Sequence, residues 1–431
     1  MNGGNPPSED DPEQAFSLEA EAAGIVLPKK HHTDPWDVVV IVVALIVLTA
    51  GIGEVTGWIN LRSGSPPSGG FETQSCSGTP VQTYGTVSSA LDPAFASWLD
   101  LSAQQLSQAV GGCFHVDVNA TAGNGYVPPL GGPHSEFAAT YTTPTQGETG
   151  GLPSPIVVVP VALSAVAIIY NVPGAPNGLN LSTAVLAGMF LGTITSWNDS
   201  AITALNPGVS LSAAPPITTF HRSGATVTNE VLTDFLANGD PAWRSAVGDG
   251  LSVSWPVGTG TPTDAAMLAQ VAATPGAVGY IEIFGTGPSG VGSAQLEDAA
   301  GDFAPAGSVG VWVAANSLAN DSAVTTGNWS NFSLANASAS GSYPLSVLSY
   351  VGIYRDLGVA YGGSLSLSNA AWLLTYLYWL TGTATVAPLP PAFVADALGV
   401  LDNETYMGTT IVHLESENGE TGESGGETGE F

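Results

Sequence analysis

A strand, a short loop and a helix follow one another in Ile217-Thr-Thr-Phe-His-Arg-Ser-Gly-Ala-Thr-Val-Thr-Asn-Glu-Val-Leu-Thr-Asp-Phe-Leu236. The β-branched run Ile217–Phe220 predicts the strand, and the apolar spacing over 229–237 predicts the helix. Small and hydroxyl residues fill the loop between them. Because the first N–H groups of a helix have no partner within it and carry partial positive charge, this loop is typical of an anion site.

Arg222 lies in that loop and would give an oxyanion a forked, charge-assisted pair of hydrogen bonds. Basic residues are rare in this chain: beyond residue 62 the only Lys or Arg are Arg222, Arg244 and Arg355. The loop by itself is equally compatible with an ordinary capped helix whose Arg222 forms a surface ion pair. Local sequence leaves both interpretations open.

The charge of the chain excludes one large class of function. Its 431 residues include 6 Lys+Arg against 36 Asp+Glu, a net charge of −30, so it offers no basic surface to the phosphates of DNA or RNA and we expect no nucleic-acid partner. With 44% hydrophobic residues and 10 Trp the chain can bury a real core, and its length favours two lobes. Either an acidic or a saline habitat would explain so acidic a surface.

The folded part alternates between helical stretches and β-branched runs. Beside Ile217–Phe220, strands are predicted over Ile156–Pro160, Ala165–Tyr170 and Val278–Ile283, and a buried helix over 370–380. This alternation predicts an α/β fold with mainly parallel sheets.

An apolar segment near the N-terminus predicts a membrane anchor. Val38 to Gly53 spans about 24 Å as a helix, and including Trp36 and Trp58 extends it to about 34 Å, enough to cross a bilayer. Lys29 and Lys30 precede it, so we expect the N-terminus in the cytoplasm and the remainder outside. The predicted segments are a disordered leader over 1–35, a transmembrane signal anchor over 36–58, a tether over 59–78 and a disordered acidic tail over 413–431. A cleaved signal peptide is the alternative.

Two features fit an extracellular location. Cys76 and Cys113 would both lie outside, where a disulfide between them is plausible, although two unrelated thiols remain the alternative. Eight Asn-x-Ser/Thr sequons predict a glycoprotein, although many could arise by chance in a chain so rich in Ser and Thr. They begin at Asn119, Asn180, Asn198, Asn320, Asn328, Asn331, Asn336 and Asn403.

Two further loops could contribute to the anion site. Ser88 and Ser89 lie just before Asp92-Pro93, an N-cap followed by proline at the start of a predicted helix. The small-residue turn Thr121–Gly125 follows a strand-like run that ends at Val118. Each loop alone is a weak signal.

Three blocks of the sequence together resemble a known family. Leu186–Gly208 with its Trp197-Asn198-Asp199, Ile217–Leu236, and Thr274–Glu282 agree in order and spacing with the substrate-binding proteins of phosphate ABC transporters. The resemblance implies a two-lobed periplasmic-binding-protein-like fold that clamps its ligand between the lobes and delivers it to an ABC transporter permease. The implied division is 79–160 with 286–412 for lobe 1 and 161–285 for lobe 2, with hinge crossings near 158–165 and 281–285.

The resemblance also implies the ligand-binding residues. Arg222 matches the phosphate-binding arginine of the family, and Thr226 and Thr228 match its hydroxyl and backbone donors. The implied set is Arg222, Thr226, Val227, Thr228, Ser89, Ala90, Gly123, Asn124 and Tyr141. Two family carboxylates are replaced here by Gly224 and Tyr141. Because carboxylates accept the hydrogen bond of a protonated phosphate, their loss leaves strict phosphate selectivity open.

The sequence thus predicts a membrane-anchored, extracytoplasmic receptor for inorganic phosphate or a similar oxyanion that performs no chemistry and needs no cofactor. The alternative is a cell-surface structural or adhesive protein that keeps the fold without tight phosphate binding. We expect no metal site, because the histidines lack ligand spacing. We expect no hydrolase, because there is no Gly-x-Ser-x-Gly turn for a nucleophile.

Overall fold

The computed structural model describes residues 81–88, 91, 106, 114–121, 130, 135–144, 149–284, 287–330, 332–382 and 387–411. These residues belong to one compact unit, Thr73–Phe431. The predicted leader, anchor, tether and tail lie outside the described residues, as do Cys76 and Cys113. Among the helices that are described, none combines the length and apolarity needed to cross a bilayer.

One sheet of nine strands carries the fold, in the order β2-β1-β3-β12-β4-β8-β6-β7, with β9 also paired to β4. Its strands are β1 (Val81–Ser88), β2 (Phe114–Thr121), β3 (Phe137–Thr140), β4 (Ile156–Asn171), β6 (Thr218–Arg222), β7 (Thr259–Thr261), β8 (Ala277–Ile283), β9 (Gly292–Ser293) and β12 (Ser346–Tyr354). The remaining short strands are β5 (Asn180–Leu181), β10 (Gln295–Glu297), β11 (Phe303–Pro305), β13 (Thr405–Tyr406) and β14 (Thr409–Thr410).

The long strand β4 belongs to both lobes. Its first part pairs antiparallel with β12 and its last part with β8, and Ala165 is paired with both. Side chains from Val159 to Tyr170 are all buried. A strand that is covered on both faces is expected to have such an almost continuous apolar sequence. Pro160 has no N–H to give the ladder, and the register with β12 shifts beside it. The two strands predicted over 156–160 and 165–170 are therefore one.

The predicted mainly parallel sheet is only partly correct. The pairs β1–β2, β1–β3, β6–β7 and β6–β8 are parallel, but β4 pairs antiparallel with β8 and β12, and β12 with β3. The reason is that β4 runs from the first lobe into the second, whereas β8 and β12 run in the opposite direction. The fold is nevertheless α/β with two lobes, as predicted.

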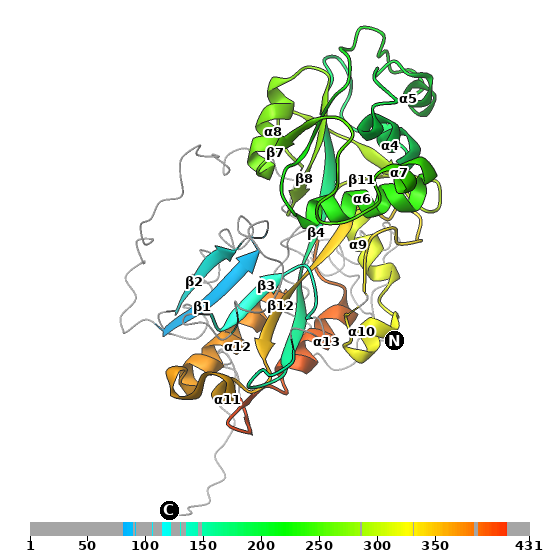
Figure 1. Cartoon of the computed structure of the whole chain (residues 1–431). Coiled ribbons are helices and arrows are strands. Elements are labelled where there is room, and N and C mark those ends of the chain that lie inside the picture. Colours follow the sequence, from blue (N-terminus) through cyan, green and yellow to red (C-terminus); the bar gives the residue numbers. More distant parts are fainter. Residues whose placement is uncertain are drawn as a thin grey trace, which may run out of the picture. The chain divides into compact units, whose positions relative to one another are not determined.

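Helices cover the strands of the second lobe on both sides. In Figure 1, α8 lies on one side of β7 and β8, and α4, α6 and α7 are grouped on the other. The helices of this lobe are α4 (Thr183–Leu191), α5 (Ser200–Leu205), α6 (Val227–Gly239), α7 (Pro241–Ala246) and α8 (Asp264–Ala273). The helix predicted over 229–237 is α6, which starts two residues earlier at Val227.

The three sequence blocks that carry the family resemblance meet at Gly276. The buried indole of Trp197 donates from Nε1 to the carbonyl oxygen of Gly276 at 2.9 Å. Gly276 has φ +86°, and a Cβ there would lie 2.4 Å from the carbonyl oxygen of Pro216, just before β6. A glycine is therefore required where β8, β6 and the Trp197 segment come together.

The first lobe is completed by the C-terminal helices. The chain continues through α9 (Ser308–Ser317), α10 (Ser322–Thr326), α11 (Leu357–Tyr361), the 3-10 turn η1 (Gly362–Ser364), α12 (Leu367–Gly382) and α13 (Pro391–Leu401). The buried helix predicted over 370–380 is confirmed as α12. Its Trp372 stacks on Phe114 of β2 with ring centroids 5.2 Å apart, which fixes the helix against that strand.

The short strands after residue 286 pair with strands of the second lobe. β9 pairs with the last part of β4, and β10 pairs with β5, so Gly292–Glu297 lies with strands of the second lobe. The predicted division placed 286–412 in the first lobe. Strands of two or three residues leave no periodic hydrophobic pattern, which explains the difference.

Candidate anion-binding site

The loop between β6 and α6 is held by hydrogen bonds from several elements. The side chain of Asn229 donates to the carbonyl oxygens of Gly224, at 2.8 Å, and Leu251, at 3.0 Å. The hydroxyl of Tyr280 on β8 accepts from the backbone N–H of Arg222 at 2.9 Å and donates to Asn229. The position of the loop is thus fixed by the strand beside it and by the helix that follows it.

The first turn of α6 presents its amides at the end of this loop. Thr226 is the N-cap, and its Oγ1 accepts from the N–H of Asn229 at 3.2 Å, while its carbonyl accepts from Glu230. The N–H groups of Val227 and Thr228 belong to the same first turn, which has no acceptors for them within the helix. Thr228 is buried, with its hydroxyl 3.0 Å from that of Thr226.

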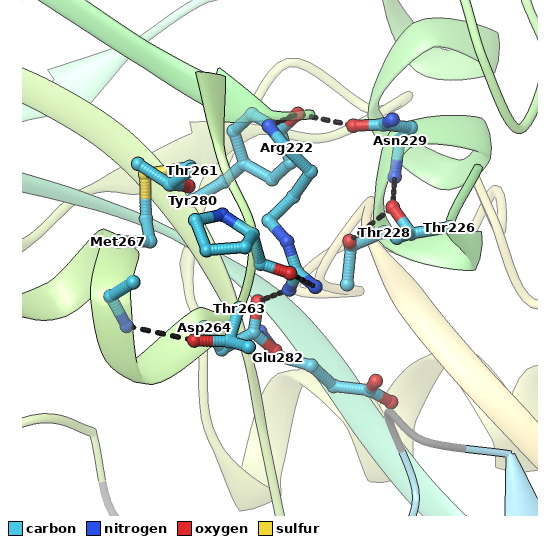
Figure 2. Close-up of polar contacts among 12 residues, drawn as sticks. Arg222, Thr226, Thr228, Asn229, Thr261, Thr263, Asp264, Met267, Tyr280 and Glu282 are labelled. Carbon is cyan, nitrogen blue, oxygen red and sulfur yellow. Dashed lines mark hydrogen bonds and ion pairs between the residues drawn. The ribbon is translucent and has the colours of Figure 1, made fainter. Parts of the chain in front are cut away.

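The guanidinium of Arg222 is buried beside this turn. Only 8% of the residue is exposed. Nη1 forms an ion pair with Asp264 at the start of α8, and Nη2 donates to the carbonyl oxygen of Pro262 at 2.9 Å. Nε is buried and has no hydrogen-bond partner among the described residues. Figure 2 shows the Arg222 side chain extending between Thr228 and Asp264. A buried cation with an unused donor is what an oxyanion site requires.

The other two arginines of the described residues have different surroundings. Arg244 donates from Nε and Nη2 to the carbonyls of Ala237 and Asn238, at the end of α6, where a cation is favoured by the helix dipole. Arg355 has a side chain that is 39% exposed and lies 3.8 Å from Glu404. Among the arginines that the structure describes, Arg222 is the one whose buried nitrogen lacks a partner.

Two carboxyl groups that the sequence analysis did not single out lie behind Arg222: Asp264, whose side chain is 25% exposed, and the buried Glu282. Asp264 accepts from Arg222 and, through Oδ2, from the backbone N–H of Glu282 at 3.3 Å. Burial raises the pKa of Asp264, and the positive charge of Arg222 opposes that rise. Glu282 accepts from the hydroxyls of Ser164 and Tyr141, each at 2.5 Å. Burial raises the pKa of Glu282 to about 8, although both hydroxyl hydrogen bonds lower it.

A pocket of about 250 Å³ adjoins this cluster. Its lining includes Tyr141 and Val227 but not Arg222, so it neighbours the guanidinium rather than containing it. Three carboxylates also line it, from Glu230, Asp234 and Asp249. Burial is the main cause that raises the pKa values of Glu230 and Asp234, and the negative charge of Asp249 contributes to both. The full lining is Tyr141, Thr142, Val227, Glu230, Val231, Asp234, Asp249, Phe332, Ser333, Leu334, Ala335, Ser346, Val347, Leu348 and Tyr350.

The structure brings together part of the predicted site. Arg222, Thr226, Val227 and Thr228 lie at one strand-to-helix junction. Tyr141 is connected to Arg222 through Glu282 and Asp264. Ser89, Ala90, Gly123 and Asn124 lie outside the described residues. Sequence reasoning missed Asp264 and Glu282. A signal was available for Glu282, since it is the one charged residue in the apolar run Ala277–Phe284.

Comparison with known proteins identifies the family. A family model described as a PBP superfamily domain matches residues 76–384. The chain belongs to the PBP superfamily. This agrees with the resemblance inferred from the three sequence blocks and with the two-lobed α/β fold.

Within the PBP superfamily, curated relatives carry phosphate-binding names. The chain is 28% identical to "Phosphate-binding protein PstS" of Xylella fastidiosa (strain Temecula1) over 241 residues, or 54% of this chain and 64% of that protein. It is 31% identical to the protein of the same name from Pasteurella multocida over 197 residues, or 46% of this chain and 56% of that protein. The aligned regions thus span less than two thirds of these relatives.

Solved structures of the same fold cover more of the chain. A crystal structure of a phosphate-binding protein from Stenotrophomonas maltophilia matches 74% of this chain and 92% of its own, with a TM-score of 0.50 and 16% identity. A crystal structure of a DING protein matches 73% of this chain and 93% of its own, with a TM-score of 0.53 and 16% identity. At this level of identity the likeness establishes the fold alone.

Proposed function

We propose that this chain is an extracytoplasmic substrate-binding protein that captures inorganic phosphate, or a similar oxyanion, between its two lobes and delivers it to an ABC transporter. The phosphate-binding names of its relatives support the ligand class. The observation that carries the proposal is the buried Arg222, whose Nε has no partner among the described residues, beside the first turn of α6, whose leading N–H groups have no acceptor within the helix. The protein acts by binding and release, with no chemical step.

The proposed contacts divide between charge and hydrogen bonding. Arg222 supplies the positive charge, and Thr226, Val227 and Thr228 supply hydroxyl and amide donors at the N-terminus of α6. Tyr141 directly follows β3 and lines the same pocket as Val227 of α6. Ser89, Ala90, Gly123 and Asn124 complete the proposed site from the first lobe.

The finer organisation is also a proposal. We assign 36–58 as a single membrane anchor, with 1–35 in the cytoplasm, 59–78 as the tether and 413–431 as a free tail. The apolar run Val38–Gly53, flanked by Trp36 and Trp58, supports the anchor. Exposed sequons support glycosylation, at Asn119, Asn198, Asn320, Asn328 and Asn403.

The test is phosphate binding by the full chain, measured by titration calorimetry at low salt. Arg222→Ala should weaken phosphate binding by a factor of about 100 or more, because hydrogen bonds to charged groups contribute about 1.5–3 kcal/mol each and Arg222 offers several donors. Arg244→Gln is the matched control, since it removes the same charge from the same lobe at a cation that already donates to two carbonyls.

Two results would contradict the proposal. The wild-type chain could bind no phosphate, or Arg222→Ala could bind phosphate as tightly as Arg244→Gln does. Thermal unfolding of each variant separates loss of binding from loss of fold, because a ligand at 100 times its dissociation constant stabilises the folded state by about 2.7 kcal/mol.

A further inference from the structure

Glu282 connects the two lobes at the edge of the proposed site. It lies on β8, opposite Val166 of β4. Its Oε1 accepts from the hydroxyl of Ser164 on β4, and its Oε2 accepts from the hydroxyl of Tyr141, which follows β3 in the first lobe. Only 8% of Glu282 is exposed. Both oxygens of this carboxyl group are therefore engaged by hydroxyl donors.

The hydrogen bond to Glu282 determines what Tyr141 can offer to a ligand. A phenol has one hydrogen, and when Glu282 is ionised, above its raised pKa of about 8, that hydrogen points to Oε2 of Glu282. Burial, and then the negative charge of Glu282, raise the pKa of Tyr141 well above its ordinary value, so the phenol stays neutral and keeps that hydrogen. The oxygen of Tyr141 can then only accept a further hydrogen bond.

An acceptor beside an anion site discriminates between oxyanions. Tyr141 lines the pocket together with Val227, the first residue of α6. An oxyanion that carries a hydroxyl, such as hydrogen phosphate, can donate to the Tyr141 oxygen. At the alkaline pH where Glu282 is ionised, sulfate carries no hydrogen, and its oxygens would face the lone pairs of the Tyr141 oxygen, which is unfavourable.

We propose that ionised Glu282 is a positioning residue that holds the hydroxyl hydrogen of Tyr141 away from the ligand, so that Tyr141 selects protonated oxyanions over sulfate. This inference rests on the proposed function, because it concerns selectivity at the same site. Glu282 on β8 and Tyr141, which follows β3, share a role that neither residue could perform alone.

The first experiment compares phosphate and sulfate binding by the full-length wild type and Tyr141→Phe at pH 9. Phenylalanine keeps the ring and removes the acceptor. The ratio of the sulfate to the phosphate dissociation constant should fall about tenfold or more, mostly through weaker phosphate binding. An unchanged ratio overturns the role of Tyr141. If the wild type binds neither anion, the proposed function fails and this inference fails with it.

The second experiment isolates Glu282 through the pH profile of that ratio. The charged or titratable groups facing Glu282 are Tyr141, Asp264 and Arg222. Ionised Glu282 must accept from both hydroxyls, whereas its protonated form can instead donate to Tyr141. In the wild type, the ratio should therefore rise between pH 6.5 and pH 9. The ionisation of phosphate itself also changes the ratio with pH, and Tyr141→Phe measures that baseline. In Glu282→Gln the ratio should change with pH no more than it does in Tyr141→Phe.

A matching rise in wild type and Glu282→Gln would overturn the positioning role. A rescue variant gives a further check: Tyr141→Asp combined with Glu282→Gln places an acceptor-only carboxylate at 141 without a second negative charge behind it. Selectivity for phosphate should return in this double variant. Continued loss of selectivity, with a normal thermal unfolding transition, would also overturn the proposal.

Discussion

Glu282 and Glu404 are both buried glutamates whose pKa values burial raises to about 8, yet their regions differ. Glu282, beside the anion site, accepts from two hydroxyls. Glu404, in the first lobe, has no hydrogen-bond partner for either carboxyl oxygen among the described residues, and Arg355 lies 3.8 Å away. A raised pKa therefore does not identify a functional carboxyl. A functional carboxyl group is identified instead by its hydrogen-bond partners and by the pocket beside it.

The largest expected effect is a dependence of the protein's stability on pH, to which both Glu282 and Glu404 contribute. Burial also raises the pKa of Glu136, to about 7. Between the ordinary pKa of 4.5 and these raised values, the folded state binds more protons than the unfolded state. The stability that these three glutamates contribute is therefore fully present below pH 4.5 and is lost as the pH rises to 8. The free energy of unfolding should increase by an amount on the order of 5 kcal/mol from pH 8.5 to pH 5.

Urea denaturation of the full chain at these two pH values measures the difference. Such a trend would agree with the acidic habitat considered from composition, because the protein would be most stable where its surface carboxylates also begin to lose charge. Higher stability at pH 8.5 than at pH 5 would contradict the assignment of raised pKa values to these three glutamates.

A pair of isosteric variants separates the two regions. Glu404→Gln should stabilise the protein by about 2 kcal/mol at pH 9, where the native carboxylate is charged and poorly paired, and should have little effect at pH 5. Glu404→Gln should leave unchanged both the phosphate dissociation constant and the ratio of the sulfate to the phosphate dissociation constant. Glu282→Gln should change that ratio. If Glu404→Gln altered anion binding as much as Glu282→Gln, the distinction between a structural and a functional glutamate would be wrong.

The smallest effect concerns two helix N-caps with the same role. Thr226 caps α6 at the anion site, and Ser182 caps α4 within the same lobe. Replacing either by Ala should lower the free energy of unfolding by about 1 kcal/mol. Only Thr226→Ala should also weaken phosphate binding, by severalfold. Equal phosphate affinity in the two variants, at matched stability, would exclude Thr226 as a ligand contact.

The sequence predicted the parts of this fold that long patterns encode. The Arg222 loop lies between a strand and a helix, as expected, and the buried helix over 370–380 is α12. The antiparallel middle of the sheet could not be predicted from composition and alternation, because strand direction depends on how the chain crosses between lobes. β9 to β11 are too short to leave a pattern.

In the site, too, contacts between residues close in sequence could be predicted and contacts between distant residues could not. Arg222, Thr226 and Thr228 are neighbours in sequence, so their junction could be inferred directly. The contacts of Arg222 with Asp264 and of Tyr141 with Glu282 join residues separated by 42 and 141 positions. The sequence suggested that Gly224 and Tyr141 leave the site without carboxylates, whereas the folded chain places two carboxyl groups behind it, from α8 and β8.

The central claim is that an oxyanion binds at Arg222 and the first turn of α6. A crystal structure of the full chain grown with phosphate tests it most directly. We predict a phosphate oxygen within hydrogen-bonding distance of Arg222 Nε, with other phosphate oxygens accepting from the amides of Val227 and Thr228. A phosphate bound elsewhere, with the Nε of Arg222 still lacking a partner, would contradict the account.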